Sequence, residues 1–114
     1  MEHAPDIEAE ITYLSTANGG RQGYVASGYR GQFHYDGHDW DAPQYFVESD
    51  RVEPGESVTA RLYFLTPQAH VGKVKVGTVF LVREGLKTVG YGRITKLLNL
   101  ENHAAQVMRE ESGA

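Results

Sequence analysis

Apolar and polar residues alternate along most of this chain with a period of two. In residues 7–13, isoleucine, alanine and tyrosine alternate with glutamate and threonine, and residues 58–64 and 74–82 repeat the pattern. Successive side chains of a β-strand point to opposite faces, so this period predicts half-buried strands. Further strands are expected in three segments: residues 31–35, 44–48 and 88–98. The alternation therefore predicts an all-β fold.

Turn signals separate the expected strands. They are Asn18-Gly19-Gly20, Asp36-Gly37, Pro54-Gly55 and Glu84-Gly85. Glycine reaches positive φ without strain and proline fixes φ, so these pairs favour chain reversals. About six short strands at this spacing are typical of a β-sandwich or a closed β-barrel. Glycines inside strand-like runs fit bulges or sharp bends at barrel corners, and they are Gly77, Gly90 and Gly92.

The two ends of the chain lack the alternation. Residues 1–6 are polar, and we expect a flexible N-terminus there. Residues 7–98 would form the barrel domain. Residues 99–114 place Leu100, Ala104 and Met108 at helical spacing, which indicates a short C-terminal helix or a fraying tail.

Length and composition exclude several classes of protein. A chain of 114 residues fits one domain, and the absence of cysteine excludes disulfides and zinc–thiolate sites. A formal net charge of −4 disfavours broad affinity for nucleic acid. With no signal-peptide pattern and no apolar run of membrane-spanning length, we expect a cytoplasmic protein without membrane contact.

Residues 84–88 superficially resemble the end of a phosphate-binding loop. Such a loop needs adjacent glycine and lysine on a strand-to-helix turn, whereas Leu86 separates Gly85 from Lys87 between two expected strands. No pair of base and nucleophile stands out elsewhere. We therefore expect no bound nucleotide, no cofactor and no enzymatic activity.

One polar cluster could hold a metal ion through His34, Asp36, His38 and Asp39. Imidazole and carboxylate groups are common ligands of divalent metals. On a continuous strand, His34 and His38 would share a face but lie about 13 Å apart. The Asp36-Gly37 turn between them leaves the geometry open, and an exposed hairpin loop is the alternative.

Several segments share a pattern with one known family. Residues 19–21 read Gly-Gly-Arg, and residues 28–33 read Gly-Tyr-Arg-Gly-Gln-Phe, close to Gly-Tyr-Arg-Pro-Gln-Phe in the family. Residues 80–92 read Phe-Leu-Val-Arg-Glu-Gly-Leu-Lys-Thr-Val-Gly-Tyr-Gly, where the family has Phe-Ala-Ile-Arg-Glu-Gly-Gly-Arg-Thr-Val-Gly-Ala-Gly. Residues 52–56 and 9–15 are similar to its Met-Pro-Gly-Asp turn and its opening strand. These segments follow one another along the chain as they do in the family, and the chain resembles the third, C-terminal domain of translation elongation factor Tu.

The resemblance implies a small closed Greek-key β-barrel of about six strands, here as a stand-alone domain. In the intact factor this barrel contacts the T-stem of aminoacyl-tRNA. The matching segments imply an RNA- or partner-binding face made of Arg21, Arg30, Gln32, Arg83, Glu84 and Gly85. A glycine lets backbone approach a sugar-phosphate, and Gln or Glu can bond a 2′-hydroxyl in a shallow RNA groove.

Four departures from the family weaken the expected contact with RNA. Ser27 and Thr59 stand where the family has lysines, Gly31 replaces its proline, and Leu86 replaces the second glycine of the hairpin. Losing two lysines weakens a contact that is mainly electrostatic. A protein partner is the leading prediction: a translation factor, a ribosome-associated protein or a toxin that docks on elongation factor Tu, with this chain as an interaction or decoy module. Weak binding of tRNA, helped by Lys73 and Lys75, is the first alternative, and the metal site is the second.

Overall fold

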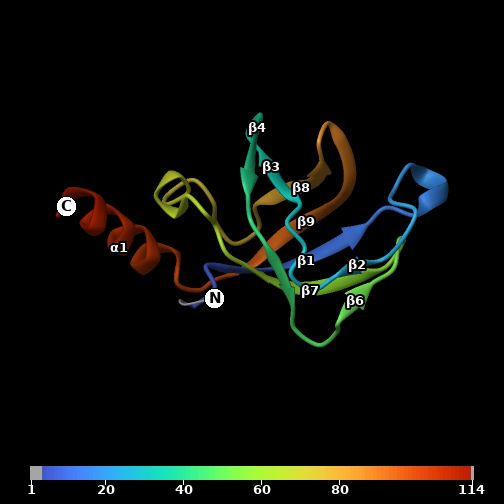
Figure 1. Cartoon of the computed structure of the whole chain (residues 1–114), viewed down its shortest axis with the longest axis horizontal. Helices are drawn as coiled ribbons and strands as arrows, with labels where there is room; N and C mark the ends of the chain where they lie inside the picture. The colour runs from blue at the N-terminus through green and yellow to red at the C-terminus, as the bar shows by residue number, and fades with distance from the viewer. Residues whose placement is uncertain (1–3, 114) are drawn as a thin grey trace.

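The computed structural model describes residues 4–113, which form a curled antiparallel sheet and one C-terminal helix (Figure 1). The sheet runs in the order β4-β3-β8-β9-β1-β7-β5, and β2 pairs with β6 beside it. The elements, in chain order, are β1 (Ile7–Tyr13), η1 (Thr16–Asn18), β2 (Val25–Ala26), β3 (Gln32–Tyr35), β4 (His38–Asp41), β5 (Gln44–Phe46), β6 (Arg51–Val52), β7 (Ser57–Leu62), η2 (Pro67–Ala69), β8 (Val79–Glu84), β9 (Lys87–Leu97) and α1 (Leu100–Ser112).

The two edge strands of the sheet, β4 and β5, are halves of one bent segment. β4 pairs with β3, and β5 pairs with β7 after a bend at residues 42–43. The bend is hydrogen-bonded to the residues that follow β7. The N–H groups of Tyr63 and Leu65 donate to the carbonyls of Pro43 and Asp41, each at 3.2 Å. This segment joins the two ends of the sheet, so the sheet curls into a barrel, and residues 28–29 cover part of the β5 edge by bonding to Gln44.

The barrel has Greek-key topology. β3, the bent β4–β5 segment and β7 are joined consecutively and pair as neighbours. β1 lies beside β7 although residues 14–31 separate it from β3, and β8 and β9 complete the ring between β3 and β1. Three consecutive strands with a fourth returning beside them define the Greek key. The prediction of a closed Greek-key barrel of about six strands with a short C-terminal helix is confirmed.

Aromatic rings fill the barrel interior. Phe33 stacks on Phe80 at 4.1 Å between ring centroids and meets Phe64 edge-on at 5.1 Å. Phe80 occupies the space left by Gly92, because a Cβ on that glycine would lie 2.4 Å from Cζ of Phe80. Gly92 therefore serves close packing, while the strand irregularity lies next to Gly90, where the β8–β9 register shifts.

One expected strand begins later than the alternation predicts. Residues 74–78 form an irregular segment with a turn at residues 76–77, and β8 starts only at Val79. Positive φ angles at Gly72 (80°) and Gly77 (95°) break the extended conformation on both sides. Val74 is nevertheless buried, so its apolar character reflects core packing and not a strand.

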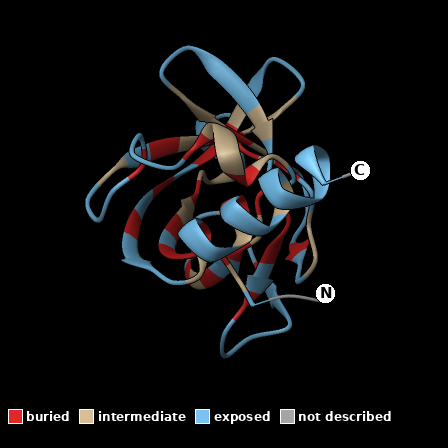
Figure 2. Ribbon diagram, turned by 90° about the vertical axis from the view of Figure 1, so that its left-hand side faces the viewer, coloured by how far each residue is buried: buried red, intermediate tan, exposed pale blue. Residues whose placement is uncertain are grey.

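α1 extends from one end of the barrel, and most of its surface is exposed (Figure 2). Leu100 and Ala104 are the helix residues buried against the barrel end that includes η2. His103 reaches Asp6, whose carboxylate is fully buried. The flexible N-terminus predicted for residues 1–6 falls partly on residues 1–3, which lie outside the described residues, whereas Asp6 is held inside the fold. No helix within residues 4–113 is long and apolar enough to cross a membrane.

Candidate functional site

The residues expected to bind RNA or a partner lie around the β8–β9 hairpin and the neighbouring strand β3. Gln32 on β3 pairs in register with Arg83 on β8, so both side chains leave the same outer face of the barrel. Glu84 and Gly85 continue from Arg83 into the turn, where Gly85 has a φ of 60°. The family segments thus meet in space although they are about 50 residues apart in the chain.

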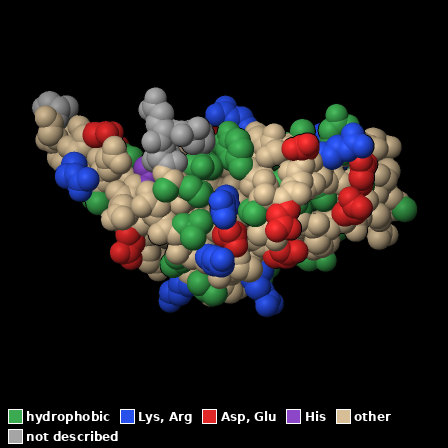
Figure 3. Space-filling model, turned by 90° about the horizontal axis from the view of Figure 1, so that it is seen from below, with side chains coloured by type: hydrophobic (Ala, Val, Ile, Leu, Met, Phe, Trp, Pro, Cys, Tyr) green, Lys and Arg blue, Asp and Glu red, His purple; other side chains and the backbone are tan. Residues whose placement is uncertain are grey.

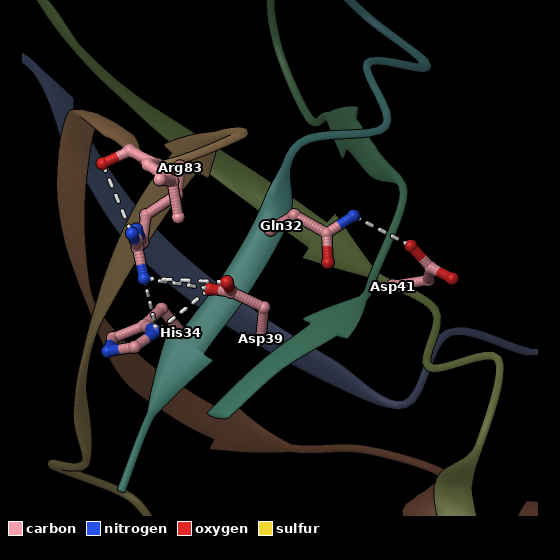
Figure 4. A network of polar contacts seen from close by, with 6 residues as sticks. Gln32, His34, Asp39, Asp41 and Arg83 are labelled. Carbon is pink, nitrogen blue, oxygen red and sulfur yellow. Dashed lines mark hydrogen bonds and ion pairs between the residues drawn. The ribbon is translucent and has the colours of Figure 1, made fainter. Parts of the chain in front are cut away.

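Arg83 is held by groups of the barrel itself (Figure 4). Its Nη1 lies 3.4 Å from both carboxylate oxygens of Asp39 and 3.1 Å from Nδ1 of His34, while Nη2 donates to the carbonyl of Leu86 at 3.1 Å. Only 17% of its side chain is exposed. A guanidinium already neutralised by a carboxylate has little to offer a phosphate.

Glu84 receives two donors from segments far away in the sequence. Nε of Arg21 lies 2.6 Å from its Oε2, and the hydroxyl of Tyr29 donates to the same oxygen at 2.5 Å. Burial and the adjacent carboxylate raise the pKa of Tyr29 far above its ordinary value, so the hydroxyl keeps its proton and stays a donor. Together with Arg83, these contacts fix the base of the hairpin on both sides.

Gln32 and Arg30, the remaining predicted residues, differ in their surroundings. Nε2 of Gln32 donates to Oδ1 of Asp41 at 2.8 Å, as Figure 4 shows, whereas Arg30 is exposed. Gly31 between them is buried against the ring of Tyr29, and a Cβ there would lie 2.5 Å from Cε2. The glycine that replaces the family's proline therefore leaves room for the tyrosine that holds Glu84.

The structure brings together two of the four residues of the expected metal site, His34 and Asp39, whose Nδ1 and Oδ1 lie 2.8 Å apart, but not the full set. Asp36 and Gly37 both have positive φ and form a two-residue turn, which pairs Tyr35 with His38 and His34 with Asp39. His34 and His38 consequently lie on opposite faces of the hairpin, and not on the shared face that a continuous strand would give them. In the part of the chain that the structure describes, no three His, Cys, Asp or Glu side chains group so that they could hold a metal ion.

Two residues of this site escaped the sequence reasoning. Tyr29 lies within the recognised segment at residues 28–33, but its partner Glu84 is 55 positions away, which no local pattern reveals. From the sequence, Leu86 differs from the family only by replacing the second glycine of the hairpin. In the structure its side chain is 90% exposed at the hairpin tip. An apolar residue next to a turn glycine was the signal available in the sequence.

The closed ring of six strands, the Greek-key connections and the braced β8–β9 hairpin define a small all-β barrel domain. The family described as the elongation factor Tu C-terminal domain matches residues 1–98. The chain therefore belongs to the family of elongation factor Tu C-terminal domains, and the match ends just before α1. This confirms the resemblance and makes the chain a module related to translation factors.

Replacing Tyr29 by phenylalanine should lower the free energy of unfolding by about 2 kcal/mol, because a hydrogen bond to a charged group is lost from a partly buried carboxylate. Urea denaturation of purified protein measures the change. Tyr45→Phe is the matched control, since that ring is 38% exposed and its hydroxyl makes no hydrogen bond with residues 4–113. Equal stability of the two variants would contradict the role given to Tyr29.

Proposed function

We propose that this chain is a non-catalytic protein-binding module of the translation machinery, which uses the hairpin formed by β8 and β9. One observation supports the proposal above all. The polar side chains at this hairpin are paired within the barrel, while the side chain that projects from its tip is an exposed leucine, Leu86. Such a surface suits an apolar pocket on a protein better than a phosphate backbone.

The electrostatics of the barrel favour a protein partner over RNA. Ser27 and Thr59, which replace family lysines, serve the barrel: Oγ of Ser27 accepts the N–H of Phe46, and Thr59 donates to Glu10. On the face shown in Figure 3, basic side chains are interspersed with acidic ones. Affinity for a nucleic acid backbone needs several unpaired cations acting together. The arrangement supports selective protein contact instead.

The hairpin is also rigid enough to present Leu86 in one conformation. Arg83 holds the carbonyl of Leu86, and Nζ of Lys87 donates to the carbonyl of Gly20 at 3.2 Å. A loop fixed before binding loses little conformational entropy when it docks. A partner that recognises this barrel in elongation factor Tu, such as a translation factor, a ribosome-associated protein or a toxin, would meet the same fold here with a different hairpin tip.

Capture from cell lysate on immobilised protein tests this function. We expect recovery of a translation factor, a ribosome-associated protein or a toxin, and a loss of about 30-fold in its affinity for Leu86→Glu, because a buried charge would replace an apolar anchor. Leu65→Glu is the matched control, as Leu65 is 52% exposed away from the hairpin. A captured partner that binds both variants equally would contradict the assignment to the hairpin.

Filter binding with tRNA separates the protein-binding function from its RNA alternative. We expect no retention at physiological salt. Clear retention that weakens steeply with added salt and disappears in Arg83→Ala would favour the tRNA-binding function instead. The folding of Arg83→Ala is checked by circular dichroism, because Arg83 also pairs with Asp39.

A further inference from the structure

A second surface lies on the outer side of β8, β9 and β1, outside the site proposed above. Leu81 on β8 and Tyr91 on β9 are direct cross-strand partners, and both face outward. Val79, two residues before Leu81, is 58% exposed, and Tyr91 is 48% exposed. Side chains of this size on neighbouring strands form one continuous apolar strip, since cross-strand pairs touch and every second residue shares a face.

The strip borders a groove with a volume of about 400 Å³. The groove is shaped by Gly92 in the middle of β9 and by two charged residues, Glu10 and Arg93. Its lining is Glu10, Thr12, Val79, Tyr91, Gly92 and Arg93. A concave apolar surface on the outside of a closed barrel plays no part in the core, because the interior is already filled by Phe33, Phe64 and Phe80.

The apolar bulk of this strip comes from Leu81 and Tyr91. At the positions of Leu81 and Tyr91 the family stretch given above has alanine. Two alanines replaced by leucine and tyrosine add a large exposed apolar area to the sheet. Apolar patches of that kind mark interaction surfaces, because left uncovered they promote aggregation.

The charges beside the groove are complementary to each other but do not pair within the chain. Glu10 on β1 and Arg93 on β9 are register partners, yet Glu10 accepts a hydrogen bond from Thr59 at 2.9 Å instead. Within residues 4–113 the guanidinium of Arg93 makes no hydrogen bond or ion pair. One surface therefore carries an available cation, a carboxylate beside it and an apolar strip.

We infer that this face is the interface between two copies of the chain related by a two-fold axis. A two-fold interface brings the same patch of both subunits together, so each residue that contacts a partner residue is contacted by it in turn. The apolar strips would cover each other at the centre. Arg93 of each copy would meet Glu10 of the other, which gives every charge a partner.

A second copy fits these features better than an unrelated partner, because the patch is complementary to itself. A strongly acidic partner would leave Glu10 facing like charge, and a strongly basic one would oppose Arg93. Pairing a surface with its own copy satisfies both residues at once. The inference goes beyond the proposed function, as it concerns a different set of residues from the hairpin tip around Leu86.

Sedimentation equilibrium of the purified chain tests the interface. We expect a reversible dimer, and each single charge reversal, Arg93→Glu or Glu10→Arg, should weaken it at least about tenfold by placing like charges opposite each other. The double variant Glu10→Arg/Arg93→Glu should restore the dimer to within about threefold of the wild type. Arg109→Glu on α1 is the matched control and should leave the association unchanged.

Three results would overturn the inference. They are a wild-type chain that sediments as a monomer up to about 0.5 mM, a dimer that neither single reversal weakens, and a double variant that stays monomeric although circular dichroism shows it folded. Leu81→Ala/Tyr91→Ala tests the apolar strip independently and should also give monomers. Both sites are on the outer face, so this variant is expected to keep the barrel intact.

Discussion

Replacing Asp6 by alanine should lower the free energy of unfolding by about 3 kcal/mol and loosen α1 from the barrel. The carboxylate is fully buried: Oδ2 accepts the N–H of Phe64 at 2.7 Å, and Oδ1 lies 2.9 Å from Nδ1 of His103. Alanine would leave a buried backbone N–H without its acceptor and a histidine without its carboxylate. Each of these losses is among the larger effects of single substitutions.

Urea denaturation gives the stability change, and amide hydrogen exchange reports on α1. Exchange in the helix should accelerate more than exchange in β9, because the contact of Asp6 with His103 joins the helix to the start of β1. Asp50→Ala is the matched control, as Asp50 is an exposed carboxylate between β5 and β6. A loss below about 1 kcal/mol in Asp6→Ala would show that the buried carboxylate contributes little.

The sequence predicted most of the barrel because alternation and turn chemistry act locally. Residues 7–13 form β1 as expected, and Asp36-Gly37 forms the two-residue turn between β3 and β4. The alternation failed over residues 74–78, where the buried Val74 lies in an irregular segment between Gly72 and Gly77. Asp6 was also out of reach, since a polar residue next to the chain terminus carries no local sign of burial.

The sequence indicated which segments lie near the β8–β9 hairpin, but it did not indicate how their side chains pair. The family segments include both Gln32 and Arg83, which the structure pairs across β3 and β8, while Glu84 contacts Arg21 and Tyr29 instead. Whether their charges face solvent or each other depends on register across strands far apart in sequence. The contact of Glu84 with Tyr29 and that of Arg83 with Asp39 depend on that register. Those contacts add to the lost lysines as an argument for the proposed protein partner over RNA.

Lowering the pH from about 6.5 to 4 should reduce the free energy of unfolding by about 3 kcal/mol through His70 alone. His70 is fully buried and stacks on Phe64 at 4.0 Å between ring centroids. Burial, with a smaller contribution from Lys73, lowers the pKa of His70 from 6.5 to about 4. The unfolded chain therefore binds a proton in this pH range that the folded chain excludes, and stability falls as pH falls.

The contacts of the imidazole explain why its charged form is excluded. Burial raises the pKa of the Tyr35 hydroxyl, which keeps its proton and lies 2.6 Å from Nδ1 of His70. Nε2 is buried and has no hydrogen-bond partner within residues 4–113. Protonation would put a hydrogen on both ring nitrogens, which leaves the buried Nε2–H without an acceptor and places a full charge among aromatic rings.

Urea denaturation at several pH values between 7 and 4, on the wild type and on His70→Leu, isolates this contribution, because all carboxylates are common to both proteins. From pH 7 to pH 4, the free energy of unfolding of the wild type should fall by about 3 kcal/mol more than that of His70→Leu. His38→Leu is the matched control, since His38 is exposed and should leave the difference unchanged. Parallel pH curves for the wild type and His70→Leu would mean that the folded state accommodates the imidazolium, and that the ring packed on Phe64 is not kept neutral by its surroundings.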